Sequence, residues 1–127
     1  MRRLLNVAVV AGLSAVLSGC YDVPVIPPKP TPSEIVAANA TTEISREFAG
    51  KTDLKQNLAK FLEKLGDAKT TNELYTAWAE IYPDHPRVIN RTIDKSMRDF
   101  YWPVAPVTDG RVYVDGFRKA AEDLSSS

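Results

Sequence analysis

The 127-residue chain has only one cysteine and one histidine. One cysteine can neither form an internal disulfide nor supply the cysteine ligands of a structural zinc site. The histidine, His85, lies between Pro83 and Pro86, where the sequence predicts a turn. A histidine-based metal site or a Ser-His-Asp triad would depend on this one side chain, and glycine-rich phosphate loops are also lacking. We therefore predict no metal ion, no cofactor and no enzymatic activity.

The chain also lacks a surplus of either charge, because 16 Lys and Arg residues balance 16 Asp and Glu residues. Nucleic-acid-binding proteins are usually distinctly basic, so we expect no nucleic-acid partner. The hydrophobic fraction of 44% is ordinary for a folded protein and argues against disorder along the whole chain. The length predicts one small domain.

Only one long apolar run is present. Residues 4–17 are almost wholly apolar and follow Arg2 and Arg3. A positive start followed by a short apolar run is typical of a secretory signal peptide. A transmembrane helix needs about 20 apolar residues, so this run is too short to span a bilayer comfortably. We predict that residues 1–19 are a signal peptide.

The apolar run ends in a motif that contains the single cysteine, Leu17-Ser18-Gly19-Cys20. This motif resembles the lipobox of bacterial lipoproteins, in which a leucine and two small residues precede an obligatory cysteine. The resemblance implies that a signal peptidase recognises Leu17, Ser18 and Gly19, and that Cys20 carries a diacylglycerol and becomes the acylated amino terminus. Two or three acyl chains are enough for stable anchoring, whereas one chain is marginal. Membrane lipid is therefore the first expected partner.

The residues after Cys20 bear on which membrane holds the anchor. Inner-membrane lipoproteins of enteric-type bacteria commonly carry aspartate directly after the cysteine, but here Tyr21 stands at that position. This departure favours the periplasmic face of the outer membrane. Removal of Arg2 and Arg3 would leave 14 basic against 16 acidic residues, so a basic patch would not add to the attachment.

A proline-rich segment follows the cysteine. Residues 21–32 hold five of the nine prolines. Proline fixes φ and lacks an amide donor, so the segment favours extended polyproline II structure and reaches roughly 35–40 Å. We interpret residues 20–32 as the acylated cysteine and a tether. The alternative is a docking motif that adds to the sheet edge of a partner.

The pattern after the tether predicts a mainly α fold, a small bundle of four or five short helices over residues 33–124. The strongest apolar stripe runs from Leu54 to Leu65, and Thr70 with Glu73 forms a capping box. The expected helices run from Ser33 to about Ala49, from Thr52 or Asp53 to Gly66, from Thr70 to Pro83 and from Pro86 to Pro103, with a last short helix capped by Asp115. Residues 125–127 are expected to be a disordered tail.

Valines and a turn signal interrupt the helical pattern near residues 104–114. Val112 and Val114 favour strands, and Asp109-Gly110 is typical of a tight turn. These residues predict a minor β-hairpin. On the first expected helix, Glu43 and Glu47 alternate with Arg46 and are expected to face solvent.

Three consecutive aromatic residues, Phe100-Tyr101-Trp102, stand out. Successive helical residues turn by about 100°, so the three cannot all face one core. Exposed aromatics beside arginine are typical of interfaces. The candidate partner or ligand surface therefore comprises Trp78, Arg98, Tyr101, Trp102 and Arg111. The alternative is that the aromatic side chains pack in the core beneath the predicted hairpin.

A second resemblance covers under half of the chain, from about Thr71 to Leu124. Asp109-Gly110-Arg111-Val112 leads into Asp115-Gly116-Phe117 and an alanine-rich helix. This stretch resembles the C-terminal end of periplasmic solute-binding proteins of the nitrate, sulfonate and taurine transport class. Such proteins have two lobes, so the resemblance implies a remnant without their ligand cleft.

These features predict a membrane-anchored, non-enzymatic lipoprotein that presents a helical domain to a protein partner in the cell envelope, as assembly factors, secretion-channel accessories, pilot proteins and exclusion lipoproteins do. The alternative is a small-molecule-binding module whose pocket is lined by Trp78, Tyr101, Trp102 and Arg111. A pocket of about 300 Å³ or more lined by these aromatics would favour the ligand module. A flat apolar patch would favour the protein partner.

Overall fold

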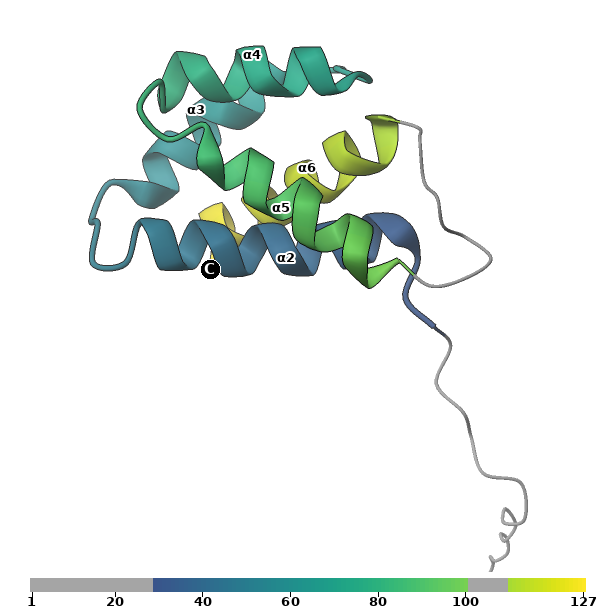
Figure 1. Ribbon diagram of the computed structural model, residues 1–127. Coiled ribbons are helices and arrows are strands. Elements are labelled where there is room, and N and C mark those ends of the chain that lie inside the picture. The colour runs from purple at the N-terminus through teal and green to yellow at the C-terminus, as the bar shows by residue number, and fades with distance from the viewer. Residues whose placement is uncertain (1–28, 101–109) are drawn as a thin grey trace, which may run out of the picture.

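The computed structural model describes residues 29–100 and 110–127, and these residues form a helical bundle (Figure 1). Its helices are α2 (Pro32–Glu47), α3 (Leu54–Leu65), α4 (Thr71–Ile81), α5 (Arg87–Asp99) and α6 (Gly110–Ser126). The described part of the chain contains no strand, and the predicted mainly α fold is confirmed. The predicted signal peptide, Cys20, Tyr101 and Trp102 lie outside the described residues.

Capping boxes start two of the helices. Thr70 Oγ1 accepts a hydrogen bond from the Glu73 amide at 3.2 Å, and Glu73 Oε1 accepts one from the Thr70 amide at 3.1 Å, as the sequence predicts. The helix expected to start at Ser33 begins earlier, because Thr31 forms the same reciprocal pair with Glu34 and caps the helix. Pro32 therefore belongs to helix α2 rather than to the tether, since proline is well tolerated in a first turn.

Helix α2 packs against both α5 and α6, and α3 packs against α4 and α6. The α2–α6 crossing is close, because a Cβ atom at Gly116 would lie 2.4 Å from Val36 Cγ1 and 3.0 Å from the Ala37 amide nitrogen. The largest fully buried side chains are Trp78, Phe61, Phe117, Ile44, Leu58, Leu74 and Ile89. These side chains come from all five helices and form one core.

The prediction of a β-hairpin is wrong for its second half, residues 110–114. Residues 110–114 form the first turns of α6, and Asp115 lies inside this helix instead of capping it. Tyr113, Val114 and Phe117 are buried at helical spacing, so packing against the core overrides the preference of valine for strands. Residues 104–109 of the predicted hairpin lie outside the described residues. The helix continues to Ser126, two residues beyond the predicted domain end.

Different helix ends and connections lie at the two ends of the bundle. Figure 1 shows the described chain entering α2 at the end of the bundle where α5 finishes. The α2–α3 and α4–α5 connections lie together at the opposite end. A hydrogen bond between Glu47, the last residue of α2, and His85, in the α4–α5 connection, links the two at this end. The helical rise places the two ends of α2 about 24 Å apart.

Candidate functional site

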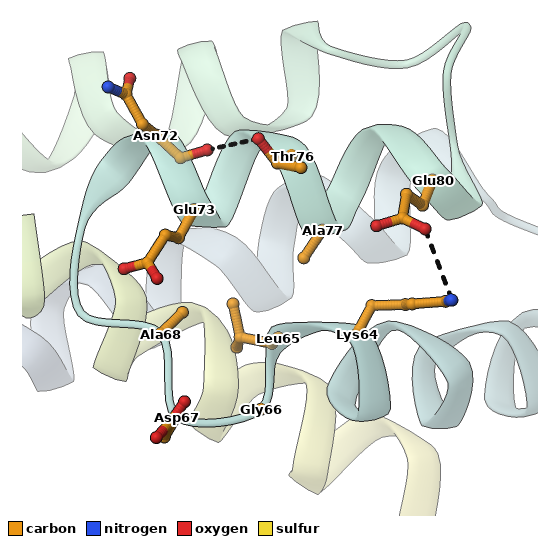
Figure 2. A pocket seen from close by; sticks show the side chains of 10 residues that line it. All are labelled: Lys64, Leu65, Gly66, Asp67, Ala68, Asn72, Glu73, Thr76, Ala77 and Glu80. Atoms are coloured by element: carbon orange, nitrogen blue, oxygen red, sulfur yellow. Dashed lines mark hydrogen bonds and ion pairs between the residues drawn. The ribbon is translucent and has the colours of Figure 1, made fainter.

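A groove of about 360 Å³ lies between α3 and α4 (Figure 2). Its apolar part comes from Leu65 on α3, Ala77 on α4 and Ala68 in the connection between them. At one end, Lys64 Nζ lies 3.4 Å from Glu80 Oε1. The volume of the groove is above the minimum of about 300 Å³ expected for a ligand pocket. Among the described residues, however, no aromatic side chain lines it.

The acidic Glu73 at this groove already has a structural role. Its Oε1 atom accepts hydrogen bonds from the amides of Lys69 and Thr70 at 3.0 and 3.1 Å. The backbone bond from Lys69 is the main cause that lowers the pKa of Glu73, followed by the hydroxyl and amide of Thr70. Nearby, the Thr76 hydroxyl donates to its own helix. Intramolecular contacts therefore occupy several polar groups of the groove.

Trp78, which the sequence analysis places on the candidate surface, is buried with 1% of its surface exposed. Its Nε1–H donates a hydrogen bond of 2.8 Å to the His85 carbonyl oxygen. Its ring packs against Phe61, Phe48 and Tyr82. The prediction of Trp78 as a surface residue is therefore wrong, because its ring packs inside the aromatic part of the core.

The two predicted arginines lie on separate helices. Arg98 is exposed on α5 and forms an i,i+4 ion pair with Asp94 at 2.5 Å. Arg111 is exposed on α6 and borders a cavity of about 290 Å³ beside the turn at Gly66. Because Trp78 is buried, the described residues do not combine it with these arginines into one surface. Tyr101 and Trp102, the remaining members of the predicted surface, lie outside the described ranges.

A charged cluster that no local sequence pattern predicts lies at the end of α2. Glu47 Oε2 accepts a hydrogen bond from His85 Nδ1 at 2.7 Å and lies 3.3 Å from Arg87 Nε. We call Glu47, His85 and Arg87 the Glu47 cluster. The hydrogen bond from His85 is the main cause that lowers the pKa of Glu47, with the charges of Arg87 and Arg91 adding to it against the opposing effect of burial. Glu47 is thus held as an anion.

The surroundings fix the histidine of this cluster in place. The His85 ring contacts Phe48 and Tyr82 edge-on, with centroid distances of 4.9 and 5.9 Å. Its carbonyl oxygen is held by Trp78, and its amide donates to the Tyr82 carbonyl oxygen. His85 lies in the turn that the sequence predicts, and both its ring and its backbone connect this turn to the core.

Glu43 and Glu47 do not face solvent as expected. The Glu43 side chain is only 7% exposed, and Arg46 Nη1 lies 3.2 Å from its Oε2 atom. One turn earlier, Asn39 donates hydrogen bonds to Ser96 Oγ at 3.0 Å and to Asp99 Oδ2 at 3.1 Å. Asn39, Glu43 and Glu47 recur every four residues, so they form one polar stripe beside the apolar stripe of α2. That spacing was the available signal in the sequence.

No group of three or more His, Cys, Asp or Glu side chains that could hold a metal ion occurs within the described ranges. Among the described helices, none combines the length and apolar character needed to cross a membrane. Comparison with known proteins gives no matching family model, no similar curated protein and no similar solved structure.

Proposed function

We propose that the chain is a lipoprotein held by lipid on Cys20 at the periplasmic face of the outer membrane. In this proposal, the helical domain binds a protein partner and serves as a non-enzymatic assembly or accessory factor of the cell envelope, of the secretion-channel, pilot or exclusion type. The motif Leu17-Ser18-Gly19-Cys20 carries the proposal, because the only cysteine stands where the lipidation chemistry requires it.

The position of the domain along the chain supports this proposal. Helix α2 begins at Pro32, so 11 residues separate Cys20 from the first helical residue. That segment includes four prolines and is long enough to hold the domain away from lipid headgroups. A lipid anchor at Cys20 would thus be connected to the end of the bundle where α2 begins, and the Glu47 cluster lies at the other end of α2.

The groove between α3 and α4 favours a small-molecule function less. Its volume of about 360 Å³ is sufficient. However, Lys64 and Glu80 pair with each other at its rim, and Glu73 is engaged in the cap of α4. A small ligand would have to replace these intramolecular contacts. We therefore favour a protein partner over a small ligand.

Replacement of Cys20 tests the anchor. In the native cell, Cys20→Ala should move the protein from the membrane fraction to the soluble fraction, while Ser18→Ala should leave it in the membrane because it keeps a small residue in the motif. Mass spectrometry of the wild-type product should show a chain that begins at an acylated Cys20. An intact leader, a bare thiol at Cys20 or membrane attachment of Cys20→Ala would each contradict the proposal.

Crosslinking in intact cells tests the partner. The anchored wild-type protein should capture one defined envelope protein, and this capture should weaken when Cys20→Ala removes the domain from the membrane surface. Crosslinks to lipid alone, or an unchanged pattern in Cys20→Ala, would contradict the proposal of a partner in the envelope.

A further inference from the structure

We propose that Arg46, Arg87 and Arg91 form an interaction surface, here called the arginine face, that binds an acidic segment of a protein partner. This inference rests on the proposed function, since it identifies where the domain contacts its partner and the chemistry of that contact. Arg46 comes from the last turn of α2, whereas Arg87 and Arg91 come from the first two turns of α5.

The arginine face presents cations outward and keeps its carboxylates beneath. The side chains of Arg46 and Arg87 are 63% and 59% exposed, while those of Glu43 and Glu47, with which they pair, are 7% and 15% exposed. Arg91 is also exposed, and its charge acts on Glu47. Arg46 and Arg87 are thus several times more exposed than the carboxylates with which they pair.

The ion pairs orient two of these guanidinium groups and leave donors available. Arg46 pairs with Glu43 through Nη1, and Arg87 pairs with Glu47 through Nε. A guanidinium carries five N–H donors in a planar fork that matches a carboxylate. Because one edge is already fixed, less side-chain freedom is lost when the other donors bind an acidic side chain.

The start of α5 adds to the attraction for an anion. The first turn of this helix contains no acidic residue, and its N-cap, Pro86, provides no side-chain acceptor. The positive end of the helix dipole therefore lies beside Arg87 without a carboxylate from the helix's own first turn. One exposed carboxylate, Asp84, lies in the preceding turn, so the carboxylates at this end of the bundle that the structure describes include Asp84 as well as Glu43 and Glu47.

The place of the arginine face favours an acidic protein segment over anionic lipid. The chain leads to Cys20 from the start of α2, whereas Arg46 lies in the last turn of the same helix. The helical rise separates these positions by about 20 Å or more. A domain tethered to lipid through Cys20 can thus direct this surface away from the membrane and toward a partner.

Binding of a fluorescent polyglutamate peptide to the full-length chain in nonionic detergent tests the inference. At low ionic strength, the wild-type protein should bind the peptide, and added salt should weaken this binding. The double variant R87Q/R91Q should bind about tenfold more weakly. The matched control R98Q removes another exposed arginine from the far end of α5 and should change the affinity by less than about twofold.

Further controls distinguish a loss of peptide binding from a loss of folding and from a failure of the lipid anchor. R91Q alone keeps the Glu47 contacts with His85 and Arg87 and should retain the helical circular dichroism signal while still weakening peptide binding. Failure of the wild-type protein to bind polyglutamate, an equal loss in R98Q, or stronger binding to phosphatidylglycerol vesicles than to the peptide would overturn the inference. Peptide binding does not require the lipid on Cys20, so it can fail while the anchor test succeeds, and the reverse also holds.

Discussion

His85 Nδ1 lies 2.7 Å from Glu47 Oε2, and this contact joins two residues that are 38 positions apart in the sequence. Glu47 ends helix α2, and His85 lies in the connection between α4 and α5. The contact therefore fixes the end of the bundle at which we place the arginine face. Because the contact involves the ionised carboxylate of Glu47, it also makes the stability of the domain depend on pH.

Glu47→Gln should reduce stability at neutral pH and have little effect in acid. The folded-state pKa of Glu47 lies below its ordinary value of 4.5, chiefly because His85 donates a hydrogen bond to the carboxylate. The stabilisation is therefore complete above pH 4.5 and is lost as the pH falls through the lowered folded-state pKa. We expect a loss of about 0.5–1 kcal/mol at pH 7, measured by urea unfolding, and a smaller loss near pH 3.

The same substitution at Glu122, which is exposed on α6, provides the control. Glu122→Gln should change the free energy of unfolding by less than about 0.5 kcal/mol at either pH. If Glu47→Gln causes the same loss at pH 7 and near pH 3, the ionised carboxylate of Glu47 does not contribute the stability that we assign to it.

Local signals in the sequence predict the helices well. The capping box at Thr70 and Glu73 involves residues three apart, so the sequence contains all of the information needed to find it. The stop at Gly66 is also local, because its φ of +52° is a conformation that glycine adopts easily. The first turns of α6 were missed because Val112 and Val114 favour strands in isolation, whereas Val114 is buried against neighbouring helices.

The candidate site could be predicted less well, because its contacts join distant residues. Glu47 meets His85 and Arg87 only after α2 and the α4–α5 turn have come together. Trp78 shows the opposite error, since an aromatic residue that could anchor a partner is buried in the core. The side-chain type suggested an interface, but burial is decided by the packing of the helices.

Gly116→Ala should strongly destabilise the domain. The added methyl group would lie 2.4 Å from Val36 Cγ1 and 3.0 Å from the Ala37 amide nitrogen, so helices α2 and α6 would have to move apart. Overpacking of this kind costs about 1–3 kcal/mol or more. Thermal unfolding should show a lowered melting temperature, while Glu122→Ala on the exposed side of the same helix should change little. An unchanged melting temperature would mean that the two helices do not cross this closely.

Trp78→Phe should destabilise the domain although it keeps an aromatic side chain. The variant loses the 2.8 Å hydrogen bond from the indole to the His85 carbonyl oxygen and leaves part of the core unfilled. We expect a loss of about 1–3 kcal/mol in chemical unfolding. Tyr75→Phe is the control, because it removes a hydroxyl that bonds Asn90 near the surface, and it should cost less than about 0.5 kcal/mol. Equal losses in both variants would contradict the burial of Trp78.

Thr70→Ala should weaken the start of α4, whereas Thr70→Ser should not. The Thr70 hydroxyl accepts a hydrogen bond from the Glu73 amide at 3.2 Å, and alanine cannot replace this bond. Loss of such a cap costs about 1 kcal/mol, while serine provides the same acceptor. Hydrogen exchange should therefore become faster at the amide of Glu73 in Thr70→Ala and stay near the wild-type rate in Thr70→Ser. If the two variants exchange equally fast, the hydroxyl does not cap the helix, and the predicted helix start must depend on the side chain of Glu73 alone.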